Sequence, residues 1–551
     1  MRIRRRTLYG TLVILLTATA LVVVRSYVLK NVQDSLLDRI EALNKSEIKI
    51  HYDTIFVDWK RNVLTIEKLV IEKDAYDTTC IYPEFISCGR VTIKGLGLLS
   101  LIFRNEIDID QISLINPHWV IHEKSELLAL DSMSRKAAEF EFYVKRVAID
   151  SMRIEFLDST ECAIKSRVRT NAFLRDLNVS VQPDRGKDFS FSEIRTNESR
   201  IDIPSIFYTF TIRESTLNLQ DHSFTLDTLR IIPSFGKLQF GRMAGNDLDR
   251  IEGVIPFFKI KDLNLQYADT LLVDAGLADI QFFLRVFHDK RLPHERKIVP
   301  LPLAQIKKIP FGLMVDQLVI TKSFVEYEEI PAEADESGKI FFDNLEATLS
   351  SVTNDPYPQS KEMVLEAKGD FMGKGKVSVT AIFPHDLDQQ GTVTGSLRTL
   401  PFTRLNSMVE PAANIKFESG MLNRLDFSFR FNDRISNGEV SLNYEDLKVL
   451  SFKSDEQMEK AEKRKHKSKK SEDDLRKDNF KTFIINAFLV KKNLDETVPA
   501  EKRSGTIHFE RDRSRSIFNF WWKSVFTGVK SAFNLDKAEA TVEKLKSRKK
   551  K

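Results

Sequence analysis

Alternation of apolar and polar residues runs through most of the chain between residues 48 and 453. The stretch "LDFSFRF" shows it plainly, because every second residue is apolar and the residues between them are polar or charged. A period of two is typical of a β-strand with one buried face, so the chain is predicted to be mainly β. The residues predicted to line one apolar face of two adjoining strands are Leu425, Phe427, Phe429, Phe431, Val440, Leu442 and Tyr444.

One thirteen-residue pattern occurs three times, as "IDQISLINPHWVI" (109–121), "VKRVAIDSMRIEF" (144–156) and "VDQLVITKSFVEY" (315–327). Apolar residues recur at its first, fourth, sixth, eleventh and thirteenth positions. This spacing fits two strands with a break between them, and each unit exposes an apolar face that its neighbours must cover. We therefore expect an elongated, twisted antiparallel repeat sheet that forms a β-groove. An ordinary sandwich or barrel with similar hairpins is the alternative.

The chain opens with four arginines among residues 1–6 and then runs apolar from about Leu8 to Val24. That length is near the lower limit for a helix that crosses a hydrocarbon core of about 30 Å, so residues 7–26 are predicted to be a transmembrane helix. The positive-inside bias places residues 1–6 in the cytoplasm and everything after Tyr27 across the membrane. A cleaved signal peptide is the alternative, because residues 18–20 read Ala-Thr-Ala. In both cases the bulk of the chain is extracytoplasmic.

Composition and motifs give no indication of catalysis, of a cofactor or of nucleic-acid binding. The net charge of +5 is modest and arises largely near the two ends. The zinc-protease, paired-cysteine, nucleophile-elbow and phosphate-loop patterns are absent from the sequence, so the protein is expected not to be an enzyme and to hold no metal. Cys80, Cys88 and Cys162 are too few for a disulfide framework and are expected to be unpaired, although an oxidising compartment would permit a bridge between the first two.

Several local patterns predict loops rather than sites. "GKGK" (373–376) is expected to be a hairpin turn, and the paired acids Glu328 and Glu329 before Pro331 a solvated loop. The dense charged run at 454–479 predicts a flexible insertion, with contact to anionic lipid heads through its lysines as the alternative. Strand character resumes in residues 480–512, which are predicted to close the sheet.

Residues 513–535 include two adjacent tryptophans, and a basic tail (536–551) follows them. Apolar residues three or four positions apart predict an amphipathic helix, and tryptophans beside cations favour a position on a membrane surface. A helix that caps the open end of the repeat sheet is the alternative. The predicted apolar face comprises Phe518, Trp521, Trp522, Val525, Val529 and Phe533, with the cations Lys523 and Lys530 beside it.

The apolar N-terminal segment, "IDQISLINPHWVI", "GKIFFDNLEATLSSVTN" and above all residues 402–452 resemble the AsmA-like proteins of bacterial envelopes. The resemblance covers most of the chain and is strongest after about Gly312. It implies a repeating β-groove similar to that of bridge-like lipid-transfer proteins and a role in envelope maintenance in bacteria with two membranes. It supplies no catalytic residues. The residues that match the closing pattern of this family, G-x-x-x-L-x-Y-x-D-L, are Gly438, Leu442, Tyr444, Asp446 and Leu447.

Two classes of function follow from the sequence. In the first, a protein anchored in the bacterial inner membrane, with its bulk in the periplasm, binds or transports phospholipid along an apolar β-groove. In the second, a non-enzymatic assembly factor or scaffold supports outer-membrane biogenesis, and its own side chains fill its core. Membrane lipids and other envelope proteins are the expected partners. The main regions expected are N-terminal groove repeats (27–311) and an AsmA-like C-terminal β region (312–453).

Overall fold

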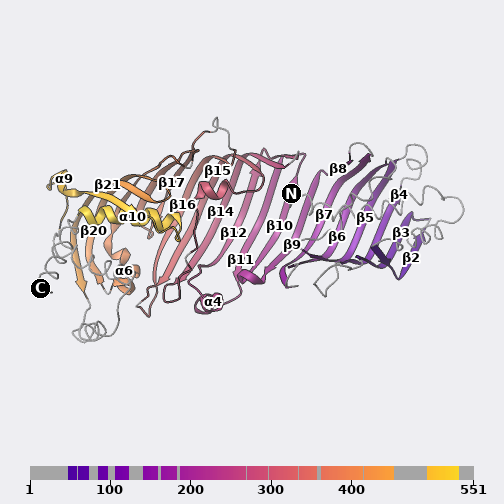
Figure 1. The fold of residues 1–551 in the computed structure, drawn as a ribbon, viewed down its shortest axis with the longest axis horizontal. Coiled ribbons are helices and arrows are strands. Elements are labelled where there is room, and N and C mark those ends of the chain that lie inside the picture. Colours follow the sequence, from indigo (N-terminus) through magenta and orange to yellow (C-terminus); the bar gives the residue numbers. More distant parts are fainter. Residues whose placement is uncertain are drawn as a thin grey trace. The chain divides into compact units, whose positions relative to one another are not determined.

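In its described residues, the computed structural model in Figure 1 is mainly β, with 22 strands of mixed sheet and few helices. This confirms the fold class predicted from the alternating pattern. The chain divides into two compact units, one of Met1–Ser234 with Ile255–Leu271 and the other of Phe235–Val254 with Leu272–Lys551. The residues that the structure describes are 48–58, 60–73, 85–96, 106–122, 140–158, 163–182, 186–267, 270–295, 297–332, 334–355, 361–386, 388–413, 415–451 and 493–532.

In the first unit the strands pair mostly with their neighbours in sequence. Antiparallel pairs link β3 to β4, β4 to β5, β6 to β7, β7 to β9, β9 to β10 and β10 to β11, whereas β5 and β6 are parallel. The elements are β1 (Ile48–His51), β2 (Thr54–Asp58), β3 (Val63–Lys73), β4 (Phe85–Leu96), β5 (Glu106–His122), β6 (Phe140–Leu157), β7 (Ile164–Gln182), β8 (Gly186–Ser190), β9 (Glu193–Ile203), η2 (Pro204–Ile206), β10 (Tyr208–Asn218), β11 (Ser223–Pro233) and β13 (Asn264–Tyr267). Strand β12 (Arg250–Lys261) contributes to both units.

In the second unit β14 and β15 are parallel, and from β15 onward each strand pairs antiparallel with the next as far as β22. The sheet is therefore mixed, and the expectation of a purely antiparallel sheet was wrong. The elements are α4 (Lys237–Ala244), β14 (Leu271–Asp289), α5 (Pro302–Ile306), β15 (Gly312–Ile330), β16 (Gly338–Thr353), β17 (Met363–Phe371), β18 (Gly375–Phe383), β19 (Gly391–Pro401), η3 (Phe402–Leu405), α6 (Asn406–Ala413), β20 (Ile415–Phe431), β21 (Ile435–Ser451), α9 (Ala500–Arg503), β22 (Ser504–Glu510) and α10 (Ile517–Ala532).

The repeated pattern forms one bent strand in each of its three occurrences, in β5, β6 and β15, rather than two strands. Its eighth residue has a left-handed backbone, with φ of 54° at Asn116, 57° at Ser151 and 40° at Lys322. Such a residue bends an extended chain and shifts the alternation of side chains by one position, as in a β-bulge. On the two sides of the bend in β5, buried apolar residues accordingly lie at even positions, Ile112 and Leu114, and then at odd ones, Trp119 and Ile121. This bend explains the spacing of the apolar residues in the repeated pattern.

Each unit has its own apolar core. In the first unit the core lies between the N-terminal strands and includes Ile71, Val91 and Phe142, each at most 1% exposed. In the second unit it lies over β17 to β22 and takes in residues of η3, α6 and α10. The two cores have no residue in common.

Several predicted segments lie outside the described residues, among them the anchor (7–26), the charged insertion (454–479) and the basic tail (536–551). Among the helices that the structure describes, none is long and apolar enough to cross a membrane. Cys88 is buried and unpaired, and burial raises the pKa of its thiol to about 11; the other two cysteines are outside the described residues. The predicted hairpin turn is confirmed, because the chain reverses between β17 and β18 with Gly373 left-handed at φ 70°.

Candidate functional site: the apolar face beneath helix α10

A row of apolar side chains crosses eight successive strands of the second unit, and we call it the inner row. The register of each strand pair places its members directly opposite one another. The next row lies on the opposite face, because side chains alternate along every strand; it is polar, with Thr348, Glu366 and Thr380 among its members. The sheet is therefore amphipathic. The inner row comprises Leu318, Leu349, Leu365, Ala381, Val393, Phe429, Gly438 and Ile507.

Burial of the inner row changes along its length. Leu318, Leu349 and Leu365, on β15 to β17, are half-buried; Leu349 and Leu365 pack against the second core, and all three keep part of their surface in contact with solvent. From β18 onward the non-glycine members are at most 2% exposed. The same apolar row is thus partly open over the first three strands and fully covered over the remaining strands.

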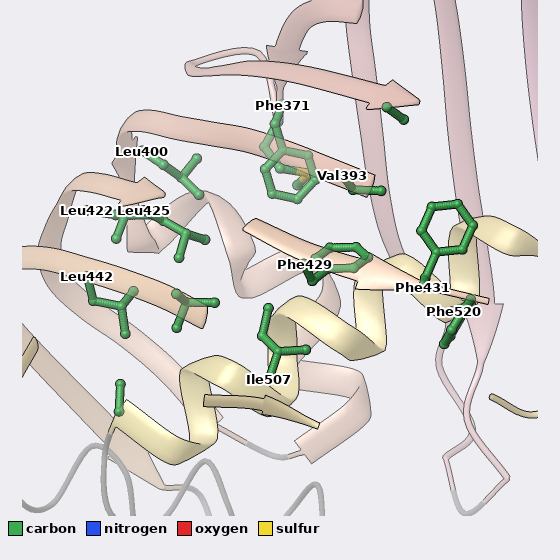
Figure 2. Packing of buried hydrophobic residues seen from close by; sticks show 14 of the residues in the cluster. Phe371, Val393, Leu400, Leu422, Leu425, Phe429, Phe431, Leu442, Ile507 and Phe520 are labelled. Carbon is green, nitrogen blue, oxygen red and sulfur yellow. The ribbon is translucent and has the colours of Figure 1, made fainter. Parts of the chain in front are cut away.

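Helix α10 covers the buried end of the inner row (Figure 2). The side of the helix that meets the sheet consists of Phe520 followed by Ser524, Gly528 and Ala532 at four-residue steps. A Cβ on Gly528 would lie 2.6 Å from Val440 Cγ1, so only glycine permits this approach. The Ser524 hydroxyl lies 2.7 Å from the Ser436 hydroxyl, and both are fully buried. Small residues therefore bring the helix close to the strands.

Aromatic rings fix the N-terminal half of α10 on the sheet. The Trp521 ring stacks on Phe383 at a centroid distance of 5.9 Å and meets Phe431 edge-on at 5.7 Å. Phe520 packs against Phe431 and Phe509, each at 6.2 Å. Contacts of this kind contribute about 0.5–1.5 kcal/mol each beyond the burial of area, which makes α10 an integral part of the second core.

The seven residues predicted to line one apolar face all belong to this core region. Six of them are at most 9% exposed, and Phe427 is half-buried and packs against the same cluster. Their neighbours in the structure are protein side chains, in particular those of α10 and of the η3–α6 segment. At this end of the sheet the protein fills its own apolar face.

The apolar face predicted for the C-terminal helix is divided between two sides of α10. Trp521, Val525 and Val529 pack against the core, whereas Phe518 and Trp522 are exposed. Phe533 lies outside the described residues. The centre of the buried side falls on Ser524 and Gly528, which the sequence reading left out because small residues carry almost no hydropathy signal.

A cluster of charged and polar side chains holds the segment that leads into α10, and we call it the anchor cluster: Asp247, His288, His294, Arg511 and Arg515. Asp247 is 7% exposed and accepts a hydrogen bond from Arg515 Nη2 at 3.1 Å. Both of its carboxylate oxygens lie 3.0 Å from His294 Nδ1. Burial acts to raise the pKa of the Asp247 carboxyl, but the hydrogen bond with His294 and the charges of Arg515 and His288 hold it below its usual value.

Arg511 ties the same segment to two other parts of the second unit. Its guanidinium side chain is fully buried, pairs with Asp433, and donates from Nη2 to the carbonyl of Val299 at 2.5 Å. Burial lowers the pKa of Arg511. A buried charge is costly unless it is paired and hydrogen-bonded, so these contacts fix the position of the segment that leads into α10.

The anchor cluster contains a serine–histidine–aspartate chain, which raises the question of catalysis. His294 Nε2 lies 2.7 Å from Ser514 Oγ. The Ser514 hydroxyl, however, donates its one proton to Asp512 Oδ1 at 2.5 Å, so Nε2 must donate to Ser514 rather than accept from it. With Nδ1 facing the Asp247 carboxylate, no ring nitrogen is available as the base that a serine nucleophile needs. The hydrogen bonds among Asp247, His294 and Ser514 therefore fit a structural role.

The paired acids predicted to lie in a solvated loop are instead part of β15, so that interpretation was wrong. Glu329 is 8% exposed, accepts a hydrogen bond from Tyr327 Oη at 2.8 Å, and pairs with Lys290 at 2.5 Å. Glu328 pairs with Lys237 of α4.

Lys523, predicted to face lipid, is half-buried, and its pKa is lowered by burial and by the charge of Lys290.

No group of histidine, cysteine and acidic side chains among the described residues has the arrangement of a metal site. Sequence comparison finds no protein family and no curated protein that matches this chain. The candidate site therefore rests on the inner row and on α10.

Proposed function

We propose that the chain binds lipid acyl chains along the open part of its inner row and so carries or shields phospholipid within a bacterial envelope. The observation that supports this most directly is the change in burial along the inner row. The row is one apolar strip in register, α10 covers one end of it, and Leu318, Leu349 and Leu365 at the other end keep apolar surface in contact with solvent. An acyl chain is a chemically matched cover for that surface.

The energetic argument is simple. Removing apolar surface from water is worth about 25 cal/mol per Å², so each 100 Å² or so that an acyl chain covers stabilises a complex by about 2.5 kcal/mol. The polar row on the opposite face, which includes Thr348 and Glu366, stays hydrated. Lipid is thereby directed to one face of the sheet, and the resemblance to AsmA-like proteins agrees with this arrangement.

The proposed topology rests on the sequence. Residues 7–26 form the inner-membrane anchor, residues 1–6 stay in the cytoplasm, and the two β units lie in the periplasm. A reporter that is active only in the cytoplasm, fused after Lys453, is expected to be inactive. A strongly active fusion would contradict the topology without bearing on lipid binding.

A scaffold for outer-membrane biogenesis is the second candidate, and the self-filled core over β18 to β22 favours it. In that case neither unit carries lipid, and the open row contacts another envelope protein. No enzymatic role is proposed, because Ser514, which lies beside a histidine and an aspartate, is already engaged by Asp512.

Native mass spectrometry of the purified full chain separates the two candidates. Phospholipid adducts are expected on the wild-type protein and should be lost in Leu365→Arg, which puts a charge into the open row. Glu366→Arg is the matched control, because it is the next residue of the same strand and points to the polar face. A wild-type protein without adducts, or equal adducts in all three proteins, would favour the scaffold.

A further inference from the structure

Helix α10 has a second apolar side, opposite the one packed on the sheet. Phe518, Trp522, Phe526 and Lys530 follow one another at four-residue steps, and we call them the outer stripe. Each lies two residues from the buried stripe of Phe520, Ser524, Gly528 and Ala532, which corresponds to about 200° around a helix. The helix is therefore apolar on the side that the protein covers and also on the side that faces away.

In the part of the chain that the structure describes, Phe518 and Trp522 of the outer stripe are exposed, whereas Phe526 is half-buried and packs against the second core. Phe518 is 47% exposed and Trp522 48% exposed. The Trp522 ring stacks on Phe526 at 5.7 Å, and Lys530 Nζ lies 5.6 Å from the centroid of the Phe526 ring. Phe518 meets Phe342 of β16 edge-on at 6.0 Å. These contacts hold the rings in place and leave about half of Phe518 and Trp522 exposed.

Charge indicates which kind of surface would cover the outer stripe. Lys530 ends the stripe, and the chain that follows α10, residues 533–551, has seven lysines and arginines against three acids. Five of the last six residues are basic. Tryptophan and phenylalanine with neighbouring cations suit the boundary between lipid headgroups and acyl chains, and a basic segment adds attraction to anionic lipid.

From these observations we infer that the outer stripe of α10 docks the second unit on the surface of an anionic bilayer. The helix lies in the plane of that surface, with Phe518 and Trp522 inserted at headgroup depth. The buried stripe and the anchor cluster keep the helix seated on the sheet during docking, so docking requires no opening of the core. This surface stands independently of lipid carriage by the inner row, because it lies on a different side of α10.

Vesicle capture by the full chain tests this inference. The full chain is held in phosphatidylcholine nanodiscs, and capture of large vesicles with and without phosphatidylglycerol is measured by sedimentation. Wild-type protein is expected to bind the anionic vesicles at least tenfold better than the neutral ones. The double variant Phe518→Ser, Trp522→Ser is expected to lose at least tenfold of that binding. Phe56→Ser removes a more exposed aromatic (63% exposed) of the first unit and should bind like wild type.

Each outcome supports or overturns docking. If amide exchange of α10 in the double variant matches that of wild type, the helix has stayed on the sheet. In a second measurement, quenching of tryptophan fluorescence by brominated lipid should disappear in Trp522→Phe. Equal capture by wild type and the double variant overturns the inference. The inference is also overturned if the double variant changes only the oligomeric state, because the outer stripe would then contact a second copy of the chain. It is likewise overturned if the double variant changes only the lipid adducts, because the outer stripe would then contact the carried lipid.

Discussion

Substitution of Gly505 by alanine tests the close approach between β22 and α10. A Cβ at this position would lie 2.1 Å from the Gly528 carbonyl oxygen, 2.4 Å from the Ala532 nitrogen and 2.9 Å from its Cα. All three are backbone atoms of the helix, so no side chain can move aside to make room. The helix must shift outward by about 1 Å to restore ordinary contact, and overpacking of this kind costs about 1–3 kcal/mol.

Amide hydrogen exchange of α10 measures that cost directly, because it reports the local opening free energy without assuming two-state unfolding of a chain with two units. A loss of about 1–3 kcal/mol accelerates exchange about 5-fold to 150-fold. Gly369→Ala is the matched control in β17, where the nearest atom to the new Cβ is 3.3 Å away; exchange of α10 should not change. Unaltered exchange in Gly505→Ala would show that the helix does not pack on β22 as described.

Three further predictions concern the core, a thiol and pH. Phe429→Asp places an unpaired charge at a site 2% exposed and should lower stability by about 4 kcal/mol or more, whereas Ser428→Asp on the polar face should change it by about 0.5 kcal/mol at most; equal melting temperatures would show the register to be wrong. With the other two cysteines replaced by serine, Cys88, whose pKa burial raises to about 11, should react at pH 8 about 100-fold more slowly in the folded than in the unfolded protein, and equal rates would contradict its burial. Because the pKa of Asp247 is lowered in the folded state, its contribution to stability is complete above about pH 4 and falls as the pH drops further; the urea midpoints of wild type and Asp247→Asn should therefore converge on acidification, and a constant gap would contradict the role given to this carboxylate.

The alternation of apolar residues was sufficient to predict the strands and the members of one face, because burial of one face imposes a period of two. The glycines of "GKGK" predicted the turn at 373–376, and apolar residues three or four positions apart predicted a helix near the C-terminus. The repeated pattern also reflected the bend, since its apolar positions change from even (fourth and sixth) to odd (eleventh and thirteenth), and such a shift needs an extra residue in the strand. The bend itself could not be located, because Asn116, Ser151 and Lys322 share no residue type that favours a left-handed backbone.

Features that depend on distant pairing were beyond the sequence. The parallel pairings of β5 with β6 and of β14 with β15 have no local signature. The anchor cluster joins Asp247 to Arg515 across 268 positions, and neither residue stands out in its own surroundings. Glu329 was predicted to lie in a loop because Pro331 follows two positions later, and the sequence carries no signal that Glu329 pairs with Tyr327 and Lys290.

Site-specific photo-crosslinking in the cell tests lipid binding by the inner row most directly. A photoreactive side chain is placed at Leu365 in the open part of the row, at Val393 in the part covered by protein, or at Glu366 on the polar face. The account predicts crosslinks to phospholipid at position 365, crosslinks within the chain at 393, and neither at 366. Absence of phospholipid at 365, or equal yields at 365 and 366, would contradict the proposal that acyl chains lie along the inner row.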